Sequence, residues 1–84
     1  MIIHNVTDKR NNWIGSWEVE PLIVSMLTEA DKGRTVIYQS GAQREAGTLT
    51  SWRHDMVWAR FSQGATACGC HPRDLFIAVA SLPL

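Results

Sequence analysis

Apolar and polar positions alternate in short runs over the second half of the chain. From residue 34 onward, runs rich in β-branched and aromatic residues are separated by turn-forming residues, a pattern typical of β-strands. Gly47 lies inside one such run, and a glycine within a strand often marks a bulge or bend. We therefore predict five strands with a curved antiparallel hairpin over Gly47–Phe61 at their centre: residues 34–39, 45–52, 56–61, 65–70 and 75–78.

The third predicted strand has two distinct faces. Successive side chains of a strand point to opposite sides of the sheet. Val57, Ala59 and Phe61 therefore share one face, and the other face carries Met56, Trp58 and Arg60. The first set is apolar, so we expect it to face the core.

The N-terminal half has a different period. Apolar residues recur there at spacings of three and four, which predicts a helix over residues 18–31. Pro21 suits the first turn of a helix and Gly33 suits its C-terminal stop. Residues 1–16 are predicted to form an irregular arm. The members of the apolar stripe are Leu22, Ile23, Met26, Leu27 and Ala30.

These elements predict an α+β fold in a single domain over residues 1–84. Its helix would precede a small curved antiparallel sheet or SH3-like barrel, because closing a small sheet into a barrel removes exposed edges. The 84 residues are enough for one domain. No basic stretch followed by a long apolar run opens the chain, and no apolar stretch approaches the ~20 residues of a membrane span. A cytoplasmic protein without a membrane partner is expected.

Opposite charges balance but are unevenly distributed. Eight Lys and Arg residues match eight Asp and Glu residues. The missing excess of positive charge disfavours non-specific nucleic-acid binding. Two interpretations remain open, internal charge complementarity or a docking surface on one face. Acidic residues gather at Glu18, Glu20, Glu29 and Asp31, whereas the remainder holds Arg34, Arg44, Arg53, Arg60 and Arg73.

Cys68, Cys70 and His71 form the most conspicuous candidate for a metal site. Thiolates and imidazoles are good zinc ligands, and His54 could complete a set. However, Cys-Gly-Cys does not have the usual Cys-x₂₋₄-Cys spacing, and the sequence has no second cysteine pair. Free cysteines in a strand usually pack as small apolar residues. No metal or other cofactor is predicted.

Nucleophilic catalysis is also unsupported. Cys70 can be combined with His71 or His54, and with Asp55 or Asp74, to draw a triad. Any small protein with three histidines allows such a combination. A domain of this size has little room for a substrate cleft. We therefore predict no catalytic residues and a protein that is not an enzyme.

Aromatic and basic residues supply a better candidate surface. Tryptophan, tyrosine and arginine are enriched at protein interfaces, and they also stack on single-stranded bases. Three interpretations stay open: protein binding, nucleic-acid binding, or burial of Trp58 under the helix or arm with Arg60 paired to Glu45 or Asp74. The predicted partner-binding residues are Tyr38, Trp52, Arg53, Trp58 and Arg60.

A set of spaced residues resembles a group of small phage- and prophage-encoded proteins of unassigned function. The resemblance covers about half of the chain, from Gly33 to Leu75. It implies a small SH3-like β-barrel and a phage or mobile-element origin, and it implies no reaction. The matching pattern is Gly33-x-x-Val36-x-Tyr38, Glu45-x-Gly47, Thr50-Ser51, Val57-x-x-Arg60-Phe61 and Pro72-x-Asp74-Leu75.

The resemblance turns the candidate surface into a functional hypothesis. Phage accessory proteins of this size commonly act by binding, in some cases as inhibitors of host defence such as CRISPR–Cas. We expect a non-enzymatic protein-binding module that docks on a host or phage protein in the bacterial cytoplasm. The alternatives are a nucleic-acid-binding small barrel and a virion assembly component. Four tryptophans in a small domain also favour a homo-oligomer.

Overall fold

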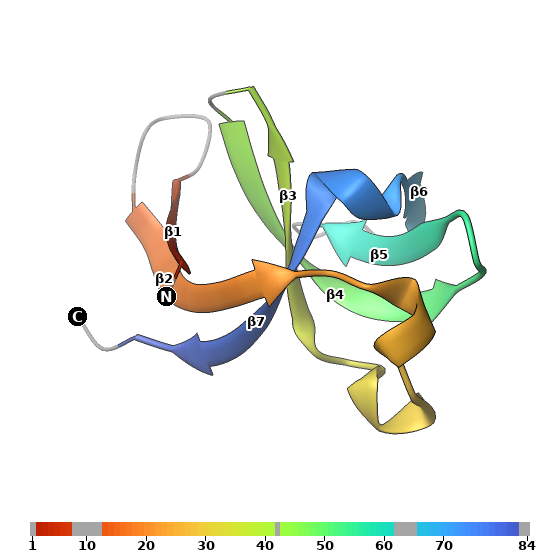
Figure 1. Cartoon of the computed structure of the whole chain (residues 1–84). Coiled ribbons are helices and arrows are strands. Elements are labelled where there is room, and N and C mark those ends of the chain that lie inside the picture. Colours follow the sequence, from red (N-terminus) through yellow and green to blue (C-terminus); the bar gives the residue numbers. More distant parts are fainter. Residues whose placement is uncertain (1, 8–12, 42, 62–65, 83–84) are drawn as a thin grey trace.

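Seven antiparallel strands form a single sheet in the computed structural model, which describes residues 2–7, 13–41, 43–61 and 66–82. Neighbouring strands follow the order β1-β2-β7-β3-β4-β5-β6 (Figure 1). The strands are β1 (Ile2–Thr7), β2 (Trp13–Pro21), β3 (Thr35–Ser40), β4 (Gln43–Trp52), β5 (Val57–Phe61), β6 (Cys68–Cys70) and β7 (Leu75–Ser81). The helical segments of the described residues are 3₁₀ turns, η1 (Val24–Met26), η2 (Glu29–Asp31) and η3 (Pro72–Asp74).

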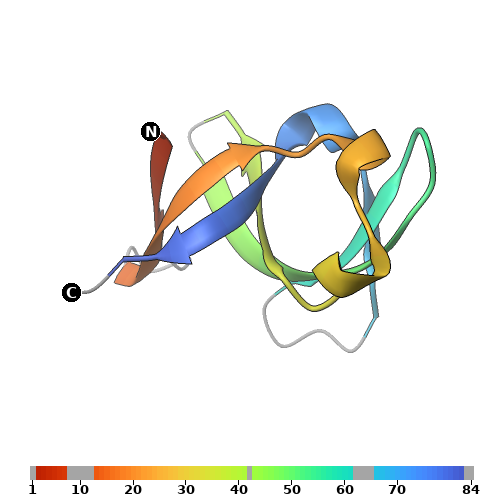
Figure 2. The ribbon, with the colours of Figure 1, turned by 60° about the horizontal axis from the view of Figure 1, so that its bottom comes forward.

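The sheet is strongly curled. Figure 2 looks into a ring that includes β7, β3, β4 and β5, while β1, β2 and the end of β7 project to one side. Chain connectivity helps to complete this ring. The turn η3 joins β6, which pairs with β5, directly to β7, which pairs with β3. The result is a small barrel-like β fold.

The main hydrophobic core lies inside the curl. Val57 and Ala59 are fully buried there and Phe61 packs against the same cluster, so the inward face predicted for this strand is confirmed. Val24 and Leu27 of the loop between β2 and β3 cover the core from one side. The buried members of the main core are Leu22, Val36, Leu49, Val57, Ala59, Cys70, Leu75 and Ile77.

A second, smaller core lies on the opposite face of β3. Successive residues of a strand point to opposite sides, so Val36 faces the main core and Ile37 faces the second core. Strands β1 and β2 cover this second face of the sheet. The buried members of the second core are Val6, Val19 and Ile37, and the partly buried Trp17, Ala46 and Phe76 pack around them.

The predicted helix at residues 18–31 is wrong. Its first part belongs to β2, which pairs with β1 on one side and β7 on the other. Ile23 and Met26 of the predicted apolar stripe are exposed, Met26 by 72%. A short isolated helix is marginal in water, whereas the backbone of β2 finds hydrogen-bond partners on two neighbouring strands. Long-range pairing therefore outweighs the local helical period.

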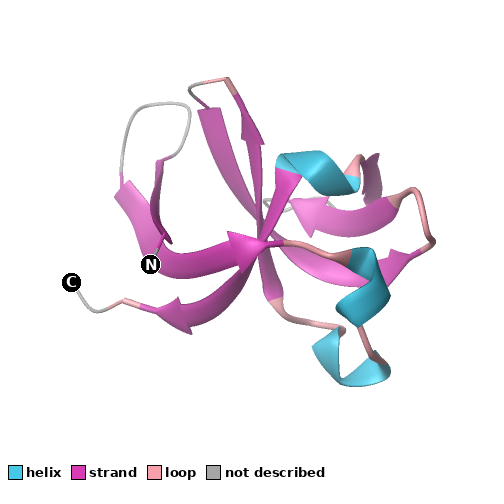
Figure 3. Ribbon diagram, in the orientation of Figure 1, coloured by secondary structure: helices cyan, strands magenta, loops and turns pink. Residues whose placement is uncertain are grey.

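The fold is consequently all-β, and the predicted α+β class is wrong. Figure 3 shows the strands as the dominant elements, with helical structure only in short turns. The described residues contain no helix of seven or more residues. None of the helical segments in these ranges is long and apolar enough to cross a membrane.

The five predicted strands correspond to β3 through β7, with shifted bounds. The range predicted as 65–70 is reduced to Cys68–Cys70, although residue 65 lies outside the described residues. The range predicted as 75–78 extends to Ser81. The predicted irregular arm instead contains β1 and the start of β2, with residues 1 and 8–12 outside the described residues.

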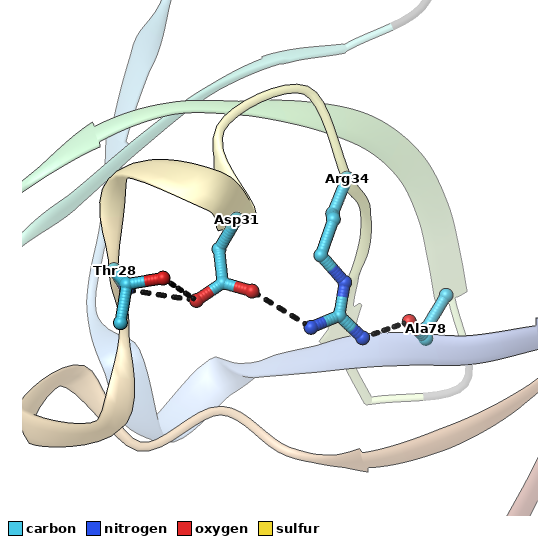
Figure 4. Close-up of polar contacts among 4 residues, drawn as sticks. All are labelled: Thr28, Asp31, Arg34 and Ala78. Carbon is cyan, nitrogen blue, oxygen red and sulfur yellow. Dashed lines mark hydrogen bonds and ion pairs between the residues drawn. The ribbon is translucent and has the colours of Figure 1, made fainter.

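A polar network anchors the loop between β2 and β3 to β7 (Figure 4). The carboxylate of Asp31 accepts hydrogen bonds from the backbone N–H and the hydroxyl of Thr28, at 2.8 and 3.3 Å. It also pairs with Arg34 at 2.9 Å, and Arg34 donates to the carbonyl oxygen of Ala78 at 2.6 Å. The Thr28 backbone hydrogen bond, followed by the Arg34 contact, lowers the pKa of Asp31. The carboxylate therefore keeps its charge, and the network, at pH values where a free aspartate starts to protonate.

Gly33 ends this loop and follows the 3₁₀ turn η2, whose C-cap is Lys32, in place of the predicted helix over residues 18–31. Its φ of 91° lies in the left-handed region, which favours glycine. Its N–H donates to the carbonyl oxygen of Leu49 at 2.9 Å, and the N–H of Leu49 donates to the backbone carbonyl oxygen of Arg34 at 2.9 Å. Glycine at this position therefore lets the chain turn directly into β3 beside β4.

Gly47 pairs regularly with both neighbouring strands, so it does not mark a bulge, one of the two features that a glycine within a strand suggests. The ladder between β4 and β5 instead shifts register between Leu49 and Ser51. Gly47 is buried directly opposite Phe61, and a Cβ at this position would lie 2.6 Å from the ring atom Cδ1. A side chain here would collide with Phe61, so close approach of the two strands explains the glycine.

His4 lies on β1, with its side chain buried against β7. Its side chain is only 4% exposed, and its ring meets Phe76 edge-to-face at 4.5 Å between centroids. Neither Nδ1 of His4 nor Nε of Arg44 has a hydrogen-bond partner among the described residues. Burial lowers the pKa of His4, and the positive charge of Arg44 lowers it further. The neutral imidazole is therefore the form that fits this site.

Acidification from about pH 7.5 to about pH 5 is expected to lower the unfolding temperature through His4. Because its native pKa is lowered, neutral His4 contributes stability that is fully present above the unfolded-state pKa of about 6.5 and is lost as the pH falls below it. Thermal unfolding at both pH values checks this. The unfolding temperature of His4→Leu should fall less on acidification than that of the parent protein. His54→Gln is the control, because this side chain is 92% exposed, and its unfolding temperature should fall as much as that of the parent protein. Equal pH dependence in His4→Leu and the parent would contradict the assignment.

Candidate docking surface

The outer face of β5 carries Trp58 and Arg60. These side chains point away from the main core because Val57 and Ala59, their neighbours in the strand, point into it. Ser51 of β4 lies opposite Trp58 on one side, and Gly69 of β6 lies opposite it on the other. Trp58 is half-buried and Arg60 is exposed. We call Trp58, Arg60 and Arg53, which stacks on Trp58, the docking face.

Local contacts position the indole of Trp58. Because Gly69 has no side chain, the ring lies close to β6, and a Cβ on Gly69 would be 3.3 Å from the indole nitrogen Nε1. Such a Cβ would also lie 3.4 Å from Sδ of Met56. The hydroxyl of Thr50 donates to the backbone carbonyl of Trp58 at 2.9 Å. The ring thus lies beside Gly69 and Met56 on the outer face of the sheet.

Arg53 extends the docking face beyond the start of β5. Its guanidinium carbon lies 5.1 Å from the Trp58 ring centroid, within the range of a cation–π contact. Its backbone N–H donates to the carbonyl of Met56 at 2.8 Å and helps to close the turn. Asp55 lies 4.0 Å from Nε of Arg53, with both side chains mostly exposed. An exposed contact of this length adds little stability, so the guanidinium remains accessible.

Arg60 has no ion-pair partner among the residues that the structure describes. The predicted alternative, in which Arg60 pairs with Glu45 or Asp74, is therefore not seen in these ranges. Trp58 is also not covered by a helix, because the predicted helix is absent. Its indole N–H makes no hydrogen bond within the described part of the chain. Both side chains thus keep unused donor groups.

Tyr38 and Trp52 do not join the docking face. Tyr38 packs against the main core and meets Phe61 edge-to-face at 6.1 Å. Trp52 lies opposite the buried Val57, also on the side of the main core, and Nζ of Lys32 is 5.9 Å from its ring centroid. The structure therefore brings together three of the five predicted residues and places the other two on the opposite face of the sheet.

Sequence reasoning placed Met56 on the outer face with Trp58, but it missed the contributions of Gly69 and Asp55 to the docking face. Gly69 was treated only as a spacer between two cysteines. Its contribution depends on the pairing of β5 with β6, which places it opposite Trp58. If the register of β5 and β6 is known, a glycine paired with a tryptophan on the neighbouring strand indicates that the indole ring can lie over the glycine.

The two cysteines lie in different environments. Cys70 is buried in the main core, and burial raises the pKa of its thiol. Cys68 is exposed, and its carbonyl accepts a weak hydrogen bond from Sγ of Cys70 at 3.7 Å. The described residues contain no group of three His, Cys, Asp or Glu residues that could hold a metal ion. His54 is exposed in the turn before β5.

The docking face offers two guanidinium groups, an aromatic ring and an indole N–H donor on one side of the sheet. Comparison with protein-family models, with curated proteins and with solved structures gives no match, so a functional assignment rests on this geometry.

Proposed function

We propose that this protein is a non-enzymatic binding module that recognises a partner protein through the docking face. The observation that carries the proposal is the placement of Trp58 between two arginines on an exposed sheet face, with Arg53 stacked 5.1 Å from its ring. Tryptophan and arginine are the residues most enriched at interface hot spots. Strand β5 holds the backbone of Trp58 and Arg60, and Arg53 already stacks on the ring, which reduces the side-chain ordering that binding would require.

The biological setting belongs to the same proposal. The small barrel-like fold is compatible with an SH3-like barrel, the type that the resemblance to phage and prophage proteins implies. We propose that the module is encoded by a phage or prophage and docks on a host or phage protein in the bacterial cell. Inhibition of host defence, including CRISPR–Cas, is the class of role that this resemblance suggests.

Replacing Trp58 and Arg60 together with alanine is expected to abolish partner capture, with at least a tenfold loss of affinity. The tagged protein is incubated with bacterial lysate, retained proteins are identified, and the strongest is purified for titration. Both side chains lie outside the main core, so the circular dichroism spectrum should not change.

Arg73→Ala provides the matched control, because this exposed arginine lies on η3 and not on the docking face. It should leave capture unchanged. If the double variant folds and captures the partner as well as the parent protein does, the docking face is not the interface.

Nucleic-acid binding is the second candidate, and the Arg53–Trp58 pair is the observation that favours it. Bases stack on aromatic rings, and guanidinium groups contact phosphates. Against it, the docking face has only two arginines and Asp55 lies 4.0 Å from one of them. Retention of the pure protein on single-stranded DNA at low salt, lost on replacing Trp58, would favour this function over protein binding.

A further inference from the structure

The two arginines of the docking face differ from Arg34, whose charge is paired within the fold. Arg34 uses its charge within the fold, on Asp31 and the Ala78 carbonyl. Arg60 has no ion-pair partner in the described ranges, and Arg53 has only the 4.0 Å contact with Asp55. Their positive charge is therefore left largely uncompensated on one face of a protein whose net charge is zero.

Spacing constrains what could compensate these charges. Trp58 and Arg60 are two residues apart on the same face of β5, which corresponds to about 6.6 Å along the strand. Arg53 reaches the Trp58 ring from the turn that precedes β5. Arg53 thus approaches Trp58 from the start of β5, and Arg60 follows Trp58 on the same face of the strand. An extended chain repeats its side chains on one face at the same interval of about 6.6 Å.

We infer that the partner presents an acidic extended segment whose carboxylates, on one face of the segment, bind Arg53 and Arg60 while its backbone crosses Trp58. This inference rests on the proposed function. Arginine binds carboxylates through charge-assisted and often bidentate hydrogen bonds. The unpaired indole N–H of Trp58 is available to a carbonyl oxygen of the segment. In the free protein the carboxylate of Asp55 lies 4.0 Å from Nε of Arg53, and a carboxylate of the segment replaces it when the segment binds.

Protein carboxylates fit this face better than a nucleic-acid backbone does. Phosphate-driven binding draws its affinity from many contacts made by clustered positive residues. Here two arginines act with an acidic residue close to one of them. Two carboxylates match this charge count, whereas a longer run of phosphates would meet no further arginine of the docking face.

Titration of the ¹⁵N-labelled full chain with defined probes tests the inference. The probes are a ten-residue peptide that alternates Glu and Thr, the same peptide with Gln for Glu, and a short oligothymidylate. The Glu peptide should shift the indole N–H signal of Trp58 and bind more weakly as salt is raised. The Gln peptide should leave that signal unchanged. The Trp58 signal is assigned with Trp58→Phe.

Three variants sharpen the test. Arg60→Gln should weaken binding of the Glu peptide about two- to fivefold, as expected for an exposed charge pair. Asp55→Asn should strengthen it about twofold, because it removes the competing carboxylate. Arg73→Gln should change nothing. A gain of affinity in Asp55→Asn is not expected if Arg53 and Asp55 serve only to hold the turn.

Each contrary result overturns the inference. Absence of a shift with the Glu peptide, equal shifts with the Gln peptide, or binding of oligothymidylate at tenfold lower concentration would each do so. These failures differ from failure of the proposed function. Suppose that replacing Trp58 abolishes capture of the purified partner while Arg60→Gln and added salt have no effect. The docking face is then the interface, and the inference that the partner presents an acidic segment is wrong.

Discussion

Gly47→Ala is expected to destabilise the fold by about 1–3 kcal/mol, the range typical of overpacking a buried site. The added Cβ would lie 2.6 Å from Cδ1 of Phe61 and 2.8 Å from the backbone carbonyl oxygen of Arg60. The Phe61 ring can rotate, but the Arg60 carbonyl belongs to the β4–β5 pair, so the two strands must move apart. Urea unfolding, followed by tryptophan fluorescence, gives the free energy of unfolding.

Gly69→Ala is the matched control for this prediction. The nearest atoms to its added Cβ would be Nε1 of Trp58 at 3.3 Å and Sδ of Met56 at 3.4 Å. Both belong to side chains on the outer face, which can shift by a few tenths of an ångström. The expected loss is below about 0.5 kcal/mol. Equal losses at the two glycines would show that contact with the backbone is not what makes Gly47 necessary.

Ile37→Ala is expected to cost about 2–5 kcal/mol, as for other large-to-small changes in a core. Ile37 is fully buried, and its neighbours on the adjacent strands, Ala46 and Phe76, belong to the same second core. Only three buried apolar residues form that core among the described residues, so the neighbouring side chains have little means of filling the cavity. A domain of this size has a total stability of about 5–15 kcal/mol, so the loss is a large fraction.

The location of the damage distinguishes this prediction from general destabilisation. Amide hydrogen exchange should accelerate first in β1 and β2, which cover the second core, and less in β5 and β6. Ile14→Ala provides the control, because Ile14 lies on β2 and is 54% exposed. Its effect should stay within about 0.5 kcal/mol. Uniform acceleration across the sheet in Ile37→Ala would contradict the assignment of Ile37 to a separate core.

Local patterns of apolar and polar residues were sufficient to predict a strand and its inward side chains where the strand has one apolar and one polar face. The alternation of Val57, Ala59 and Phe61 with Trp58 and Arg60 placed β5 and its inward side chains correctly. The same alternation did not lead to a correct prediction of β2, and the reason is physical. Its inward residues also alternate, but Pro21 and the apolar residues after it match a helical period, and its partners β1 and β7 come from distant parts of the chain.

The candidate surface was predictable only in part, because one register shift decides which side Trp52 occupies. Without it, Leu49 and Trp52 would point to opposite faces of β4. The shift between Leu49 and Ser51 returns Trp52 to the inner side, opposite Val57. The residues 50 and 51 carry no glycine or proline that would mark an irregularity. Arg53 and Trp58 meet only because the turn between them folds back.

Because β3 serves two cores at once, its length is constrained more tightly than that of any strand with a solvent-facing side. Deleting or inserting one residue before Val36 would exchange the positions of Val36 and Ile37 and disturb both cores together. Related sequences should therefore vary in length at the connections and preserve the count of residues between Gly33 and Tyr38. Homologues could be aligned on this invariant spacing even after most side chains have diverged.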